Sequence, residues 1–203
     1  MMRILLLLLL SILTCLAQPA GHDLVNASRW KSATIAKHRV HEVEVIAKRI
    51  EKNIERYKKV SGETKVPWEI ISGLHNMESG GSFNHHLHEG SSLKGRTKYV
   101  PKGRPLTGTP PFAWEYSAKD ALLYDKMDKK NWKEVGSALS SVEKFNGDGY
   151  RKYHPETPSP YLWTGTSIEK AGKYIRDGVW SPTARSKQIG IAAIWKKLNA
   201  YKD

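Results

Sequence analysis

The sequence predicts a mostly α-helical domain, interrupted once by a loop-rich insertion that has room for a small β-hairpin. Apolar residues recur at helical spacing in successive segments of the 203-residue chain. Between residues 82 and 111 this spacing stops, and glycines and prolines become frequent. The sequence contains no internal repeats, so the helices are expected to form one domain over residues 40–203.

The first 17 residues have the pattern of a secretory signal peptide. Arg3 supplies a positive charge, residues 4–10 are unbroken apolar, and Cys15-Leu16-Ala17 is a small-x-small cleavage site. The apolar run is shorter than the roughly 20 residues that a membrane-spanning helix needs. We therefore expect an exported protein, periplasmic or secreted, that begins at Gln18 and has no stable membrane anchor.

Cys15 is the only cysteine, and cleavage after Ala17 would remove it. A disulfide framework is then excluded, and the hydrophobic core alone must stabilise the fold. Lipid attachment at Cys15 is the alternative, although Thr14 is an unusual residue in front of a lipidated cysteine.

The chain is strongly basic, with 33 Lys and Arg against 20 Asp and Glu and a net charge of +13. An exported protein of this charge is attracted to polyanions, of which the bacterial wall and anionic lipids are the obvious ones. Nucleic acid is the runner-up, but the sequence lacks a recognition helix, zinc-finger spacing and an aromatic-rich RNA motif. We expect a monomer that binds cell wall and no nucleic acid.

The remaining elements are predicted from spacing and from breaker residues. Residues 18–39 are expected to be a flexible lead-in, because 22–37 is polar and lacks a clear period. One amphipathic helix is expected to end at Val60, and Thr97–Val100 is a candidate strand inside the insertion. Further helices are expected over the following ranges: 115–129, 132–145, 168–175 and 189–198.

The helix expected at 67–78 carries the most informative residue, Glu78. Pro67 suits the first helical position, and Gly80 suits a helix stop. Ile71, Leu74 and Glu78 follow helical spacing, which places the carboxyl group on the apolar face. Burial and the negative end of the helix dipole both favour its protonated form, as a general acid requires. The alternative is a helix-end glutamate paired with a Lys or Arg.

These residues resemble the lysozyme superfamily. Glu78-Ser79 at the end of a buried helix, followed by Ala138-Leu139 and Phe145-Asn146-Gly147, is similar to goose-type lysozymes and soluble lytic transglycosylases. Residues 66–197 also resemble a group of bacterial lysozyme-like proteins. The segments that carry this second resemblance are His86-Leu87-His88, Arg96-Thr97, Val100-Pro101-Lys102-Gly103-Arg104-Pro105, Asn146-Gly147-Asp148-Gly149-Tyr150, Ser159-Pro160-Tyr161-Leu162-Trp163 and Ser186-Lys187-Gln188.

The resemblance implies a lysozyme-like helical fold and cleavage of the β-1,4 link of peptidoglycan glycan strands. It implies Glu78 as the general acid, with Phe145, Asn146 and Tyr150 lining the sugar cleft. The sequence departs from the family in two places. A Gly-Leu-Met-Gln segment of lytic transglycosylases is absent, and Phe145 replaces the usual Tyr.

Other polar and aromatic side chains are candidates for substrate contacts. His86 and His88 would project to one side of an extended segment, a pattern that zinc also uses. No further ligand set follows, so we expect cleft lining and neither a metal nor another cofactor. Sugar rings stack on aromatic faces, so Tyr161 and Trp163 are candidates for stacking, with core packing as an equal alternative. Ser79 completes the expected substrate-binding set.

A second carboxylate would complete a glycosidase, and Glu89, Asp120 and Asp148 are the candidates. Thr97 is a further candidate, for orienting a water. An inverting water attack would need the two carboxyl groups about 6.5–9.5 Å apart. The sequence thus favours an exported peptidoglycan hydrolase. The alternatives are a lytic transglycosylase of the same fold, a non-catalytic basic wall-binding module, and an antimicrobial or nucleic-acid-binding polycation.

Overall fold

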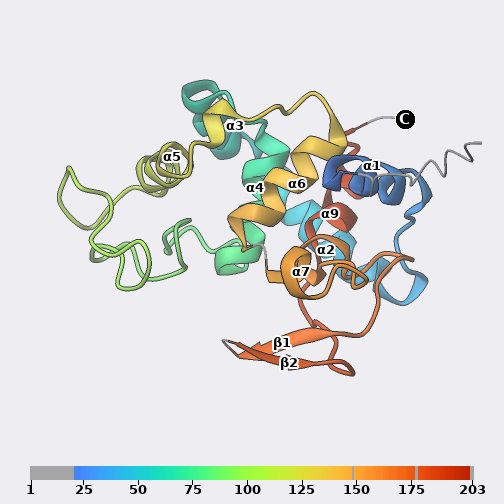
Figure 1. Ribbon diagram of the computed structural model, residues 1–203. Helices are drawn as coiled ribbons and strands as arrows, with labels where there is room; N and C mark the ends of the chain where they lie inside the picture. Colours follow the sequence, from blue (N-terminus) through green and yellow to red (C-terminus); the bar gives the residue numbers. More distant parts are fainter. Residues whose placement is uncertain (1–20, 148, 177, 202–203) are drawn as a thin grey trace, which may run out of the picture.

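The computed structural model describes residues 21–147, 149–176 and 178–201 (Figure 1). The predicted signal peptide, with Cys15, and the candidate carboxylate Asp148 lie outside these ranges. None of the described helices is long and apolar enough to cross a membrane. The elements are α1 (His22–Ser32), α2 (Val40–Lys52), α3 (Ile54–Thr64), α4 (Trp68–Ser79), α5 (Trp114–Tyr124), α6 (Val135–Phe145), α7 (Gly149–Tyr153), α8 (Pro160–Trp163), β1 (Lys173–Arg176), β2 (Val179–Ser181) and α9 (Ile191–Leu198), with 3-10 turns at Lys37–Arg39 and Met127–Lys129.

The mostly α-helical class is confirmed, and α4 lies at the centre of the fold (Figure 1). Ile70, Ile71 and Leu74 of α4 are fully buried against α3 and α9. The indole of Trp195 on α9 donates a hydrogen bond to the carbonyl of Glu69 at 3.0 Å. Because the C-terminal helix packs directly on α4, the helix that carries Glu78 is held on several sides.

The expectation of a flexible lead-in is wrong for residues 22–32, which form α1 along α6. Asn26 donates a hydrogen bond to the hydroxyl of Ser140 at 3.2 Å, and Trp30 is only 2% exposed. A Cβ at Gly136 would lie 2.1 Å from the carbonyl oxygen of Asp23, so glycine permits this close approach. The helix uses small and polar contacts, which explains why apolar spacing did not reveal it.

The insertion at 82–111 is irregular, as predicted, and extends beside α5 (green in Figure 1). The prediction of a strand at Thr97–Val100 is wrong, because this segment is irregular and forms bends. The hairpin lies instead at β1 and β2, where a helix over 168–175 was expected. Tyr174 and Trp180 face each other across it, with ring centroids 5.2 Å apart. Aromatic cross-strand pairs stabilise a hairpin, and this pair outweighs the weak helical spacing.

Several helix boundaries also differ from the expectation, and two of the differences concern α2 to α4. The single helix expected to end at Val60 is two helices, α2 and α3, which break at Asn53. Pro67 is the N-cap of α4 rather than its first helical residue. Neither change alters the face that α4 presents to its neighbours.

Candidate active site

The C-terminal end of α4 is fixed from two sides. Gly80 adopts a φ of 61° and ends the helix, as predicted, with its amide bonded to the carbonyl of Asn76 at 3.1 Å. Gln188, far along the chain, donates to the carbonyls of Met77 at 2.7 Å and Asn76 at 3.2 Å. Because both groups satisfy the last carbonyls of the helix, the backbone that carries Glu78 is held in place.

Glu78 lies on the wall of an open cleft with a volume of about 610 Å³. Two further carboxyl groups, Glu89 and Asp125, lie on the same cleft, so three acidic side chains from separate segments meet there. The other lining residues are Met77, His88, Val100, Pro101, Tyr124, Phe145, Asn146, Tyr161 and Gln188. The cleft thus combines acids with aromatic and apolar walls, as ligand-binding sites commonly do.

Burial raises the pKa of Glu78 to about 7, and the negative charges of Asp125 and then Glu89 add to this effect. Among the described residues, no Lys or Arg forms an ion pair with Glu78. The alternative of a helix-end ion pair therefore has no support in the described structure. A carboxyl group with a pKa near 7 can hold a proton and release it at neutral pH.

Only one of the two carboxylate oxygens of Glu89 has hydrogen-bond partners among the described residues. Its Oε1 accepts hydrogen bonds from the amide of Ser91, at 3.3 Å, and from the Ser91 hydroxyl. Its Oε2 is buried and has no hydrogen-bond partner in the described part of the chain. Buried polar atoms are almost always paired, so this oxygen retains an unused capacity to accept a hydrogen bond.

Asp125, at the C-terminal cap of α5, was missed by the sequence analysis. Locally it reads as an exposed acid at a helix end, and only the packing of α5 against the insertion brings it to the cleft. Burial raises its pKa, while Lys130 opposes this. Of the carboxylates considered from sequence, Asp120 lies elsewhere, in an ion pair with Arg104.

In Asp125→Asn, we expect the pKa of Glu78 to fall from about 7 toward its ordinary value of 4.5. Removing a nearby negative charge makes the ionised form of Glu78 less unfavourable, so the proton leaves at lower pH. Carbon NMR of the Glu78 carboxyl group across pH 4–9 measures the change. Asp128→Asn is the matched control, because Asp128 does not line the cleft and should leave this pKa unchanged. An equal pKa in wild type and Asp125→Asn would contradict the charge coupling.

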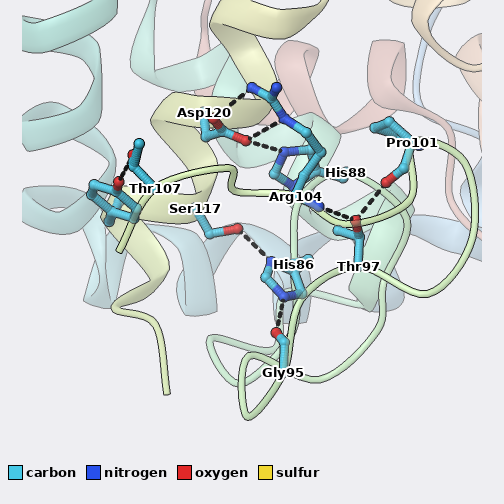
Figure 2. A network of polar contacts seen from close by, with 10 residues as sticks. His86, His88, Gly95, Thr97, Pro101, Arg104, Thr107, Ser117 and Asp120 are labelled. Carbon is cyan, nitrogen blue, oxygen red and sulfur yellow. Dashed lines mark hydrogen bonds and ion pairs between the residues drawn. The ribbon is translucent and has the colours of Figure 1, made fainter. Parts of the chain in front are cut away.

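Figure 2 shows how hydrogen bonds and an ion pair attach the insertion to α5. Arg104 donates two hydrogen bonds to Asp120, at 2.9 and 2.6 Å. The Nε2 atom of His88 lies 2.8 Å from Asp120, and burial lowers the pKa of His88 although Asp120 opposes this. Since His88 also lines the cleft, this network fixes one cleft wall.

His86 and Thr97 stabilise the insertion rather than line the cleft. His86 is fully buried, with its ring nitrogens 2.7 Å from the Ser117 hydroxyl and 2.8 Å from the carbonyl of Gly95 (Figure 2). Thr97 accepts a hydrogen bond from the amide of Arg104 at 2.8 Å and donates one to the carbonyl of Pro101. Among the described residues, no group of three or more His, Cys, Asp and Glu side chains is placed to hold a metal.

The remaining candidates divide between cleft and core. Phe145, Asn146 and Tyr161 line the cleft, and Tyr150 lines an adjoining groove. Trp163 is 1% exposed and belongs to the hydrophobic core. The Ser79 hydroxyl donates to the carbonyl of His75 at 3.2 Å, within its own helix. The structure therefore places Trp163 and Ser79 away from the cleft lining.

Gly90 permits the loop that follows α4 to fold back onto the helix end. Its φ is +78°, and a Cβ there would lie 2.7 Å from the backbone oxygen of Glu78. Gly103 has a similar φ of +83°, but a Cβ there would meet nothing within 4 Å. The two glycines thus share a backbone conformation and differ only in crowding.

We expect Gly103→Ala to lower the free energy of unfolding by about 1–2 kcal/mol, the cost of a left-handed conformation for a residue with a side chain. Gly90→Ala should lower it further, because it also pushes against the backbone of Glu78. Urea denaturation of both variants measures the difference. Equal losses would show that the loop can move away from α4 without cost.

Comparison with protein-family models, with curated proteins and with solved structures gives no match to this chain.

Proposed function

We propose that this protein is an exported glycosidase that hydrolyses the β-1,4 link between N-acetylmuramic acid and N-acetylglucosamine in peptidoglycan. The observation that carries the proposal is Glu78, a carboxyl group with a pKa of about 7 on the wall of an open cleft, without an ion-pair partner in the described structure. A glycosidase needs one protonated and one ionised carboxyl group in the same site. Raising the pKa of only one of them provides both the acid and the base.

In the proposed reaction, protonated Glu78 gives its proton to the glycosidic oxygen as the bond from that oxygen to the anomeric carbon breaks. A water molecule attacks the anomeric carbon and gives a proton to Glu89. Glu89 lines the same cleft as Glu78, and its Oε2 has no hydrogen-bond partner among the described residues. Glu89 and Asp125 contribute negative charge near the oxocarbenium-like transition state, where it is favourable.

Three observations support a wall glycan as the substrate. The cleft is open and continues into a second depression, as an extended polymer requires. Phe145 and Tyr161 offer apolar ring faces on which a sugar can pack. The net charge of +13 and the signal-peptide pattern suit a protein that meets an anionic wall outside the cytoplasm. The motifs around Glu78 and Asn146 that resemble lysozymes agree with this assignment.

Incubation of the protein with purified sacculi tests the proposal, with mass analysis of the released muropeptides. Hydrolysis gives reducing ends with the mass of one added water. Products that end mainly in 1,6-anhydro sugars would identify a lytic transglycosylase, which uses the 6-hydroxyl of the sugar instead of water. Binding without any released product would refute catalysis and favour a wall-binding module.

A further inference from the structure

A second groove, of about 690 Å³, lies between α7 and the β-hairpin and adjoins the cleft. Asn146 and Tyr161 line both depressions, so a ligand in the cleft can continue into the groove without leaving the surface. In Figure 1 the hairpin lies below α7, at the edge of the helical domain. We call this depression the hairpin groove; it is lined by Asn146, Gly147, Gly149, Tyr150, Tyr153, Tyr161, Tyr174, Ile175, Arg176 and Gly178.

The wall of the hairpin groove is preorganised by contacts between aromatic rings. Tyr150 packs edge-on against Tyr161 and Tyr174, with ring centroids 5.6 and 5.4 Å apart. The hydroxyl of Tyr150 also accepts a hydrogen bond from the amide of Tyr174 at 3.3 Å. Because α7 and the hairpin are joined by these contacts, the groove keeps its shape without a ligand, which lowers the entropy lost on binding.

The hairpin presents three consecutive residues to the groove. The strand register is irregular between Tyr174 and Arg176, which pair with Trp180 and Val179 of β2. A regular strand would point Ile175 to the opposite face, but here all three residues from 174 to 176 line the groove. The irregularity thus adds Ile175 to the groove, beside Tyr174 and Arg176.

Arg176 contributes a positive charge to the hairpin groove. It is exposed, and its guanidinium group has no hydrogen-bond or ion-pair partner among the described residues. Of the described residues that line the groove, Arg176 is the one that carries a formal charge, whereas the cleft contributes Glu78, Glu89 and Asp125. A polymer that spans both depressions therefore meets acidic residues in the cleft and Arg176 in the groove.

We propose that the hairpin groove binds the acidic peptide stem attached to the glycan strand. This inference rests on the proposed function, because the glycan in the cleft brings the stem to the groove. The sugars of a peptide-bearing strand are neutral, because the lactyl carboxyl group of N-acetylmuramic acid is amide-linked to the stem, and they would leave Arg176 without a partner. The stem peptides carry carboxylates that a guanidinium binds well. The tyrosine rings pack against the aliphatic parts of the peptide. The acidic cleft repels the stem carboxylates, which selects one orientation of the strand.

The test compares two soluble ligands: glycan strands that carry their stem peptides, and the same strands after an amidase has removed the peptides and the lactyl carboxylates exposed by this cleavage have been converted to neutral amides. Dissociation constants are measured by calorimetry with the full chain carrying Glu78→Gln, so that binding is measured without cleavage. Arg176→Gln is added to this background. Lys52→Gln, an exposed cation on α2, is the matched control for loss of one positive charge.

We expect Arg176→Gln to raise the Kd for peptide-bearing strands about two- to five-fold, the range for an exposed charge pair. It should leave the Kd for stripped strands unchanged, and Lys52→Gln should affect neither. Equal losses on both ligands would show that the groove binds sugar and overturn the inference, as would a Kd insensitive to Arg176. If wild type cleaves neither ligand but binding depends on Arg176 and on the stem, the glycosidase proposal fails and the stem site stands.

Discussion

Glu78→Gln is expected to lower kcat for wall cleavage by about 10²–10⁴, the usual contribution of general acid catalysis. The substitution keeps the shape and burial of the side chain but removes the proton that the glycosidic oxygen must receive. Release of soluble muropeptides from sacculi measures the loss. The variant should still bind sacculi, because it retains the other residues that line the cleft. Wall-solubilising activity comparable to that of wild type would refute the assignment of Glu78.

The same variant has a second expected effect, on stability. The pKa of Glu78 is raised in the folded protein to about 7 from an ordinary value of 4.5. Between these values the folded state binds the proton more tightly than the unfolded chain, so the contribution of Glu78 to stability is present at low pH and is lost as pH rises toward 7. Glutamine is neutral at every pH, so Glu78→Gln should have a higher Tm than wild type at pH 8 and a similar Tm at pH 4.

This stability measurement separates catalysis from an ordinary structural role. A glutamate that stabilised the fold through an ion pair would give a lower Tm in Glu78→Gln at pH 8. A variant that is inactive and yet more stable is the signature of an active-site group held in an unfavourable environment. Glu69→Gln, at the opposite end of α4, is a matched control, because burial also raises the pKa of Glu69 outside the cleft.

The second large effect is expected from Glu89→Gln, which should lower kcat by about 10², within the range for removal of a general base. The amide retains a hydrogen-bonding oxygen near Ser91 but cannot accept a proton from the attacking water. The loss should appear at every pH. Proton NMR of the first product made by wild type gives a further check, because attack of a water held opposite Glu78 inverts the configuration of the anomeric carbon.

Asp125→Asn is the control for Glu89→Gln, because it removes the same charge from the same cleft. Asp125 raises the pKa of Glu78 more than Glu89 does, so its loss should shift the alkaline limit of activity to lower pH. At acidic pH, where Glu78 is protonated in both proteins, Asp125→Asn should retain most of its kcat. The opposite pattern, with Asp125→Asn inactive at every pH and Glu89→Gln active, would make Asp125 the second catalytic group.

The sequence alone determined the helix that carries Glu78 and the irregular character of the segment after it. Apolar spacing placed Glu78 on the buried face of α4, Gly80 marked the helix end, and glycines and prolines marked the insertion. These features depend on local rules, since the period of a helix and the backbone freedom of glycine act within a few residues. These features can therefore be predicted without knowing which segments pack together.

Only the tertiary structure decided which groups share the cleft. Asp125 reaches Glu78 through the packing of α5, and Gln188 reaches the end of α4 from the opposite end of the chain. His86 and Thr97 look from sequence like cleft residues, but His86 is bonded to Ser117 of α5 and Thr97 to Arg104 within the insertion. The helix α1 was hidden because its contacts use glycine and polar side chains rather than an apolar stripe. Which residues share the cleft depends on contacts between segments far apart in the chain. Local spacing does not encode these contacts.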